Sequence, residues 1–307
     1  MSGGGLAGDA LAGLWASPPS LPARWFYDER GSRLFDEITR LPEYYPTRRE
    51  TEILRAHAAE IARLAAAETV VELGAGMSTK TRILLDACAA RHFVPVDVSG
   101  VVLAEAAAAI ARDYPHTTVE PVVADFAEPP SFPGRSGARL VLFLGGTIGN
   151  FDDAQRATFL ARQRAALAPG DHFLLGADLV KAPSRLLAAY DDSVGVTAEF
   201  NRNLIEVLRA TLDAEGLYVD DFQHAVRWDP ERHRIEMWLR ARRDVTARFH
   251  ALGRDWKLPA GDGMLTEISV KFRVPDLHAE LVTAGFAPVR TWTDAAGDFS
   301  LTLARAH

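Results

Sequence analysis

The sequence predicts an α/β fold built on a Rossmann-like, mostly parallel sheet. Short apolar runs alternate with helical patterns as far as Asp178, which is typical of parallel βαβ units. A glycine-rich turn separates the first apolar run from the first of these helices, at the position where such folds bind a ligand. The expected strands are 69–73, 92–96, 118–123, 139–144 and 171–176, and the expected helices lie near 79–90, 100–113 and 153–168.

The turn after the first strand is the most informative motif of the chain. The segment 69–76 reads TVVELGAG, and a helical pattern begins directly after Ser78. A strand, a glycine turn and a helix N-terminus therefore follow one another, and backbone N–H groups point above the sheet. Asp97 ends the next strand, 21 residues after Gly76, where a carboxylate can accept hydrogen bonds from ribose hydroxyls. We therefore expect a nucleoside-containing cofactor.

The spacing of the glycines narrows the choice of cofactor. A dinucleotide fingerprint has a third glycine three residues after Gly76, where this chain has Thr79. A triphosphate loop is excluded because Lys80 follows too few glycines. An E-x-G-x-G turn without the third glycine is typical of S-adenosylmethionine-dependent methyltransferases. The turn alone leaves an NAD(P) enzyme and a purely structural turn as alternatives.

The ends of four consecutive strands support a ligand site. The carboxyl ends of parallel strands form the edge of the sheet at which ligands bind. Here these ends carry glycine or polar residues, namely Gly74 with Gly76, Asp97, Asp125 with Phe126, and the segment GGTIGN at 145–150.

The pattern changes after Asp178. Two helices are expected within 183–214, and the runs 222–228 and 234–241 read as a hairpin joined by a D-P-E-R turn. Further strands are expected at 245–252, 264–272, 289–293 and 298–304. The last two indicate that the sheet ends in an antiparallel hairpin.

The composition of the chain limits the cellular compartment, the class of substrate and the type of reaction that we expect. The 307 residues are 48% hydrophobic and carry a net charge of −7 without a basic stripe, which favours a small-molecule substrate over nucleic acid. The single cysteine, the lack of a secretory leader and the lack of an 18-residue apolar run favour a cytoplasmic protein that neither forms disulfides nor spans a membrane. No two of the nine histidines have metal-ligand spacing, and no nucleophile motif occurs. Methyl transfer, which needs no protein nucleophile, fits this inventory.

Six segments of the chain are specific enough to compare with a known family. They are WFYDERGSRLFDEITRLPEYYPTRRE (25–50), VELGAGMSTKTR (71–82), FLGGTIGN (143–150), AYDDSVGVTAEFNRN (189–203), IEMWLRA (235–241) and MLTEISVKF (264–272). Together they resemble the L-histidine Nα-methyltransferases, which make hercynine, the trimethylated histidine of ergothioneine biosynthesis. The resemblance extends over nearly the whole chain from about residue 12, with one departure at Gly146, where family members carry serine.

The resemblance implies a role for individual substrate-site residues. Tyr27 would face the substrate amine. From its chemistry, we expect its hydroxyl to orient the amine, directly or through a water, and to receive its proton. Tyr44 would contact the cofactor beside the substrate pocket, and Asn150 and Tyr190 would hold the amino-acid carboxylate. Aromatic faces attract a cationic methylammonium by ~0.5–2 kcal/mol, although ordinary packing is the alternative role of these tyrosines.

The resemblance also places the imidazole of the substrate. Glu267 and Ser269 would bind the ring, and Met237 would pack beside it. The spacing agrees, because residues two apart on a strand share a face. The other face is expected to carry Thr266, Ile268, Val270 and Phe272. The alternative is a surface strand on which Glu267 pairs with Lys271 or an arginine.

The implied cofactor is S-adenosylmethionine. Lys80 as a solvated helix residue and Asp125 as a helix cap remain the alternatives to a binding role. The residues expected to line the cofactor site are Tyr44, Gly74, Gly76, Lys80, Asp97, Asp125 and Phe126.

The complete hypothesis is a class I methyltransferase with two domains. Residues 1–48 and 183–272 would form a discontinuous α+β substrate-binding domain, and 49–182 and 273–307 the S-adenosylmethionine-binding domain. The expected reaction is trimethylation of the α-amine of L-histidine by a monomer. The alternatives are the same fold acting on another amine such as tryptophan, and a non-catalytic S-adenosylmethionine-binding protein. Thr79 disfavours an NAD-dependent oxidoreductase.

Overall fold

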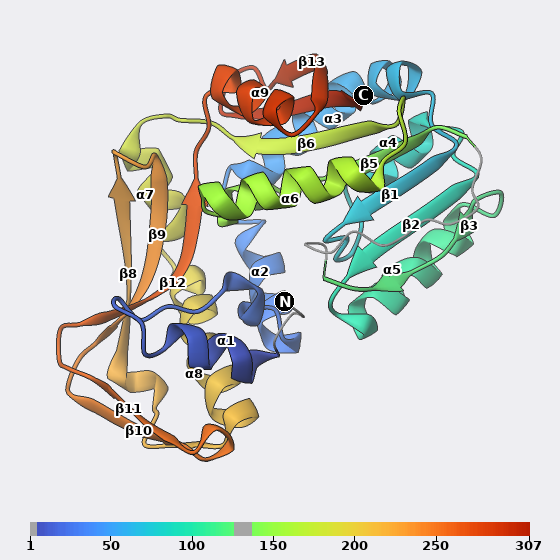
Figure 1. Cartoon of the computed structure of the whole chain (residues 1–307). Coiled ribbons are helices and arrows are strands. Elements are labelled where there is room, and N and C mark those ends of the chain that lie inside the picture. The colour runs from blue at the N-terminus through green and yellow to red at the C-terminus, as the bar shows by residue number, and fades with distance from the viewer. Residues whose placement is uncertain (1–4, 126–136) are drawn as a thin grey trace. The chain divides into compact units, whose positions relative to one another are not determined.

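The computed structural model describes residues 5–125 and 137–307, and the chain divides into two compact units (Figure 1). Unit 1 comprises Met1–Tyr45 and Lys181–Val270, and unit 2 comprises Pro46–Val180 and Lys271–His307. The expected division at 48, 182 and 272 differs by two or three residues. Residues 46–48 fall in unit 2 because they begin the helix α3 (Pro46–Ala65). The assignment of substrate to one unit and cofactor to the other stays a prediction.

Unit 2 contains a doubly wound sheet of eight strands. Its main path runs β13-β14-β6-β5-β1-β2-β3, and β4 also pairs with β2. The neighbours from β6 to β2 are parallel, while β14 pairs antiparallel with both β6 and β13. The predicted parallel sheet with a terminal antiparallel hairpin is therefore confirmed. The strands are β1 (Thr69–Leu73), β2 (His92–Asp97), β3 (Thr118–Val119), β4 (Val122–Val123), β5 (Arg139–Phe143), β6 (His172–Asp178), β13 (Phe286–Thr293) and β14 (Phe299–Ala306).

Helices cover both faces of this sheet because alternate strand residues point to opposite sides. On one face, Val70 and Leu140 pack in one cluster with Ile53 of α3. On the other face, Phe143 and Phe173 contact the ring of Phe159, at centroid distances of 4.6 and 6.5 Å. The other helices of unit 2 are α4 (Thr81–Ala87), α5 (Gly100–Asp113), η2 (Thr147–Asn150), α6 (Asp153–Ala166) and α9 (Val274–Thr283).

Unit 1 is an α+β structure with two three-stranded antiparallel sheets. The sheet β12-β9-β8 contains the predicted hairpin, formed by β8 (Phe222–Asp229) and β9 (Arg234–Ala241), with β12 (Gly263–Val270) beside β9. The second sheet joins β11 (Arg254–Leu258), β10 (Val245–Phe249) and β7 (Ala214–Glu215). The helices are α1 (Leu6–Gly13), η1 (Ala23–Phe26), α2 (Glu29–Ile38), α7 (Pro183–Tyr190), α8 (Val196–Leu212), η3 (Val219–Asp221) and η4 (His250–Leu252).

Two expectations for individual elements were wrong in detail, and two strands were missed. The single strand expected at 118–123 is two short strands, β3 and β4, and the strand expected at 245–252 is β10 followed by η4. The strands β7 and β11 were not predicted. Within residues 5–125 and 137–307, no helix combines the length and the apolar character that a membrane crossing requires.

Candidate functional site

The glycine turn after β1 has the backbone that the motif requires. Gly74 and Gly76 have φ angles of 70° and 49°, in the left-handed region that favours glycine. The Gly76 N–H donates to Oδ2 of Asp97 at 2.9 Å, and the Ser99 N–H donates to Oδ1 at 2.9 Å. Asp97 therefore braces the turn. Its oxygens retain lone pairs for further donors, and a Cβ on Gly76 would meet no atom within 4 Å, so the turn has room for an adenosine-containing group.

Glu72 supports the same turn from below and was not among the predicted site residues. Its carboxyl group is buried and accepts hydrogen bonds from the Ser78 hydroxyl at 2.7 Å and from the Thr81 hydroxyl. Burial raises the pKa of Glu72 to about 7, although both hydroxyl bonds act in the opposite direction. The first residue of E-x-G-x-G thus holds the loop that leads into α4.

Lys80 lies beside this turn but is not a solvated helix residue. Its ammonium group pairs with Glu50 of α3, whose side chain is fully buried. The two oxygens of Glu50 also accept from the N–H of Gly145, at 2.8 and 3.0 Å. At Gly176, a Cβ would lie 2.3 Å from Oε1 of Glu50, so a side chain at this position would displace the Glu50 carboxylate. Glu50 therefore connects predicted cofactor-site Lys80 to the loop that precedes Asn150.

The loop after β5 presents Asn150 at the end of η2. Gly145 and Gly146 have φ angles of 79° and 70°, and the Thr147 hydroxyl donates to the Leu144 carbonyl at 3.0 Å. A Cβ on Gly146 would lie 3.4 Å from the Phe299 ring, so the glycine at this position fits the local packing. Asn150 itself is half-buried.

The remaining predicted cofactor residues are only partly described. Asp125 is half-buried and is the last described residue before 126–136. Phe126 lies outside the described residues.

In unit 1, the three predicted tyrosines belong to one aromatic cluster. The Tyr27 ring is 5.5 Å from Phe35 and 5.6 Å from Phe200, measured between centroids, with edge-on geometry. Phe35 is 6.1 Å from Tyr44, which is 6.4 Å from Tyr190. Phe35 and Phe200 were not predicted as site residues, although both lie in segments that carry the resemblance. The cluster provides edges and faces suited to a methylated ammonium group.

Tyr190, Ser269 and Met237 meet around one face of the sheet β12-β9-β8. The hydroxyl groups of Tyr190 and Ser269 are 2.7 Å apart, and both side chains are buried. Glu267 lies opposite Met237 in the register, and Ser269 lies opposite Ile235, so Glu267 and Ser269 share a face as expected. Glu267 is half-buried and Met237 is buried.

Thr266 does not follow the expected alternation. The register of β12 shifts between Leu265 and Glu267, as in a β-bulge, and Thr266 is the extra residue. Its buried hydroxyl donates to Oδ1 of Asn201 in α8 at 2.8 Å, and also lies 3.0 Å from the Met237 carbonyl. Simple period-two alternation placed Thr266 on the face away from Glu267, and the bulge overturns that expectation.

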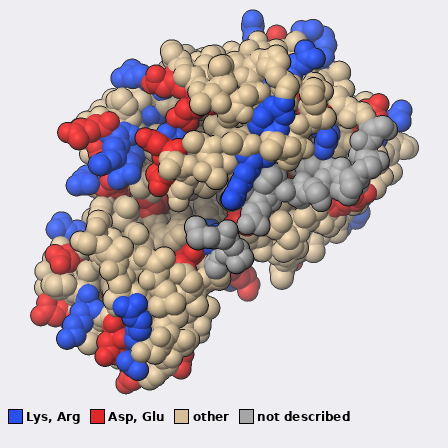
Figure 2. Space-filling model, in the orientation of Figure 1, with Lys and Arg blue, Asp and Glu red and all other residues tan. Residues whose placement is uncertain are grey.

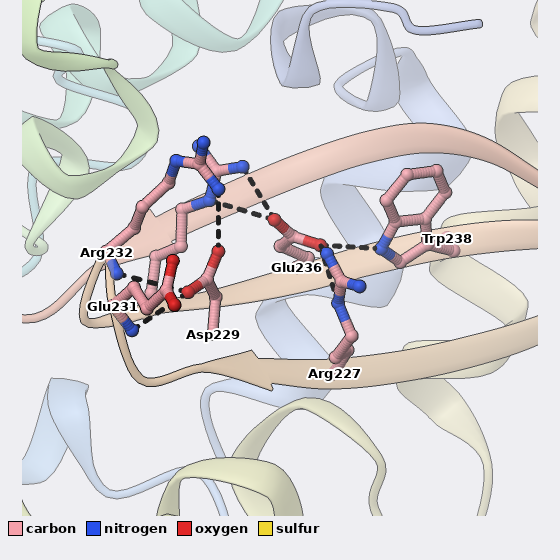
Figure 3. Close-up of polar contacts among 7 residues, drawn as sticks. Arg227, Asp229, Glu231, Arg232, Glu236 and Trp238 are labelled. Carbon is pink, nitrogen blue, oxygen red and sulfur yellow. Dashed lines mark hydrogen bonds and ion pairs between the residues drawn. The ribbon is translucent and has the colours of Figure 1, made fainter. Parts of the chain in front are cut away.

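The opposite face of the sheet is strongly charged (Figure 3). Glu236 is buried and accepts from Arg227 and Arg234 at 2.6 Å each, and from the Trp238 indole at 3.1 Å. Burial acts to raise the pKa of Glu236, but the bonds from Arg234 and Arg227 outweigh it and the pKa is lowered. Asp229 accepts from the Arg232 guanidinium at 3.1 Å beside this network. This carboxylate network joins β8 to β9 and so stabilises the hairpin.

The alternative pairing of Glu267 with Lys271 can now be judged on the geometry. Lys271, the proposed partner of Glu267 on a surface strand, is fully buried and pairs with Asp178 at 2.9 Å. Among residues 5–125 and 137–307, no group of three or more His, Cys, Asp or Glu side chains could hold a metal ion. Positive and negative side chains are interspersed on the coloured surface of Figure 2, which agrees with a small-molecule substrate.

Comparison with known proteins identifies related sequences over nearly the full chain. The profile of the family described as histidine-specific methyltransferase, SAM-dependent, matches residues 6–306. A histidine N-alpha-methyltransferase of Mycolicibacterium smegmatis is 51% identical over 96% of this chain and 93% of that protein. Ergothioneine biosynthesis protein 1 of Neurospora crassa is 30% identical over 90% of this chain, which corresponds to 32% of that longer protein.

Two solved structures share the fold. The CcbJ methyltransferase of Streptomyces caelestis has a TM-score of 0.53 and 18% identity, and the alignment covers 91% of this chain and 99% of that one. A protein of Pyrococcus horikoshii OT3 has a TM-score of 0.51 and 16% identity, covering 91% and 100%. At these identities the likeness concerns the fold.

Proposed function

The chain belongs to the family of histidine-specific, S-adenosylmethionine-dependent methyltransferases, and we propose that it trimethylates the α-amine of L-histidine to give hercynine, the first step of ergothioneine biosynthesis. The main observation in support of histidine as the substrate is that Glu267, Ser269 and Met237 lie on one face of β12 and β9. The 51% identity to histidine N-alpha-methyltransferases over nearly the whole chain supports it.

The proposed imidazole site uses three neighbouring groups. Glu267 accepts from one ring nitrogen, Ser269 bonds the other, and Met237 packs against the ring. A buried polar site of this kind rejects an apolar side chain, since its own groups would be left unpaired, and such sites discriminate by roughly 10⁴. Tyr190, whose hydroxyl already contacts Ser269, would then hold the amino-acid carboxylate together with Asn150.

The proposed cofactor site is on unit 2. Gly74, Gly76 and Asp97 would bind the adenosine part, and the resemblance implies Tyr44, Lys80, Asp125 and Phe126 as further cofactor contacts. When bound, S-adenosylmethionine supplies a methyl group already activated by its sulfonium. The protein therefore needs only to align the amine and to exclude water.

Tyr27 is the proposed proton-handling residue. An α-amine attacks a methyl group only through its free lone pair, so the ammonium form must first lose a proton. The Tyr27 hydroxyl would orient the amine and receive that proton, directly or through a water. The aromatic rings of the cluster would hold the cationic mono- and dimethyl stages for the next transfer.

Incubation of the purified chain with S-adenosylmethionine and a panel of amino acids, followed by mass spectrometry, tests the proposal. We expect histidine alone to give a product heavier by three CH₂ units, with tryptophan and other amines unchanged. Methylation of another amine in preference to histidine, or S-adenosylmethionine binding without any product, would replace this function by one of the alternatives.

The cytoplasmic location and the monomeric state remain predictions from the sequence. Cell fractionation tests the first, and light scattering of the purified chain tests the second.

A further inference from the structure

The extra residue in β12 decides which face of the sheet carries Glu267. Up to Leu265, which lies opposite Trp238, the pairing is regular, and after the shift Glu267 lies opposite Met237. If Thr266 instead paired regularly with Met237, Glu267 would lie opposite Glu236. A shift of one residue exchanges the two faces of a strand.

That alternative register would remove the proposed imidazole site. Glu267 would lie on the charged face, next to the buried Glu236 carboxylate of Figure 3. Ser269 would lie opposite Arg234 and away from the Tyr190 hydroxyl. The bulge therefore determines which side chains form the proposed site. Residues that stabilise the bulge should consequently affect substrate specificity.

Asn201 of α8 holds the bulge in place. It is fully buried, and its oxygen accepts from the Thr266 hydroxyl at 2.8 Å. Its amide nitrogen donates to the Trp238 carbonyl at 3.1 Å and lies 2.8 Å from Nδ1 of His224. One helix side chain thus contacts all three strands of the sheet. Because the carbonyl of Trp238 only accepts, the amide orientation is determined.

His224 connects Asn201 to Tyr190 by hydrogen bonds. With the Asn201 amide donating to Nδ1, the proton of the neutral imidazole is on Nε2, and Nε2 donates to the Tyr190 carbonyl at 2.9 Å. Tyr190 is consequently held at its backbone by His224 and at its hydroxyl by Ser269, two residues beyond Glu267 on β12. The hydrogen bonds form a chain from the bulge to the last residue of α7.

We infer that Asn201, His224 and Thr266 are positioning residues that set the specificity for an imidazole. They do not touch the substrate in this assignment, which rests on the proposed function. Asn201 fixes the other two residues. Thr266 then keeps Glu267 and Ser269 on the site face, and His224 holds Tyr190. The hydrogen-bonded series from Thr266 to Tyr190 consists of neutral groups that all have partners, so it specifies one arrangement of donors and acceptors.

The test compares Thr266→Val with Thr266→Ser in the full chain. Valine keeps the shape and suits a strand, but it leaves the buried Asn201 oxygen without its donor, whereas serine restores the hydroxyl. We expect Thr266→Val to raise the KM for histidine about tenfold. The KM for S-adenosylmethionine should stay within about twofold, and Thr266→Ser should restore most of the histidine affinity.

A second readout separates positioning from general stability. Discrimination between histidine and phenylalanine, as the ratio of kcat/KM values, should fall with Thr266→Val and with Asn201→Leu. The matched control is Thr302→Val in β14, which deletes a hydroxyl of a threonine that is equally buried and bonds Thr291 at 3.0 Å in unit 2. It should change the melting temperature without changing the histidine KM.

The outcomes distinguish this inference from the proposed function. A wild-type chain that leaves histidine unmethylated overturns the function before any variant is compared. A wild-type chain that methylates histidine, together with a Thr266→Val variant whose two KM values change equally or not at all, overturns the positioning role alone.

Discussion

Two groups of buried polar side chains support the proposed binding residues, and their chemistry differs. In unit 1, the chain from Thr266 through Asn201 and His224 to Tyr190 consists of neutral groups. In unit 2, the glycine turn and the neighbouring loop depend on carboxylates, of which Glu50 and Glu72 are buried. Each region has a support suited to its proposed ligand.

The contrast follows from what each support must do. Neutral hydrogen bonds have a direction, so a chain of them defines which atoms donate and which accept around a ring. A carboxylate accepts from several donors at once, and Glu50 gathers a lysine and a backbone N–H 95 residues away. Neutral groups thus suit discrimination between rings, whereas carboxylates suit the closure of loops around a cofactor. Their failure should consequently affect different quantities.

The largest expected effect is on stability, from Glu50→Ala. Removal of this fully buried carboxylate leaves the Lys80 ammonium, whose side chain is 23% exposed, and the Gly145 N–H without their common partner. Breaking a buried pair by removing one member costs about 3–5 kcal/mol of unfolding free energy. Urea unfolding of the full chain measures the loss.

The control for this prediction is on the same helix. Glu52→Ala removes a carboxylate that is 43% exposed and pairs with Arg49. Exposed pairs contribute about 0–1 kcal/mol, so this variant should unfold almost like the wild type. Equal losses for Glu50→Ala and Glu52→Ala would show that the Glu50 network does not carry the loop.

The next effect concerns substrate affinity, from Glu267→Ala. Loss of a hydrogen bond to a charged group costs about 1.5–3 kcal/mol, which corresponds to roughly a 10- to 150-fold increase in the KM for histidine. The KM for S-adenosylmethionine should hardly change. Lys80→Met is the reciprocal variant, expected to raise the cofactor KM and spare the histidine KM. If either variant changed the KM values for histidine and for S-adenosylmethionine equally, the assignment of one ligand to each region would be wrong.

A smaller effect is expected from Tyr190→Phe, which removes only the hydroxyl that contacts Ser269. A neutral hydrogen bond contributes about 1 kcal/mol, so the histidine KM should rise roughly fivefold. Ser269→Ala combined with Tyr190→Phe should cost less than the sum of the two, as groups in one network do. Tyr218→Phe, at a tyrosine that is 52% exposed, is the matched control and should leave the KM unchanged. Strict additivity would indicate that the two hydroxyls act separately.

Much of the fold could be predicted because its signals are local. The central strands β1, β2, β5 and β6 are mostly apolar runs, as expected of strands buried on both faces, and glycine marks the turn after β1. The strand β11 escaped prediction even though Trp256 and Leu258 alternate with charged residues, because these two are the only apolar residues of the strand. β7, with two residues, has no periodicity to detect.

The supports of the site could not be predicted because their signals are not local. Asn201 meets Thr266 across 65 positions of sequence, and His224 across 23. The face shared by Glu267 and Ser269 follows from period two, but the bulge at Thr266 depends on pairing with β9 and leaves no mark in the composition of β12. Residue types could therefore identify the ligand-binding positions but not the side chains that hold them.

The smallest expected effect is a change in how stability depends on pH, and it has opposite signs in the two regions. Burial raises the pKa of Glu72 from 4.5 to about 7, so its contribution to stability is fully present below pH 4.5 and is lost as the pH rises through about 7. Burial lowers the pKa of His224 below 6.5, so its contribution is present above pH 6.5 and is lost on acidification. Asp191, Asp192 and Arg202 are the charged groups that act on this imidazole.

Glu72→Gln, which cannot ionise, should therefore lose a few degrees less of melting temperature than the wild type between pH 5 and pH 8. Asp36→Asn, at an exposed carboxylate of α2, is the control and should follow the wild-type profile. A Glu72→Gln profile parallel to that of the wild type would mean that the buried carboxyl group does not titrate in this range, and the contrast in pH response would then rest on His224 alone.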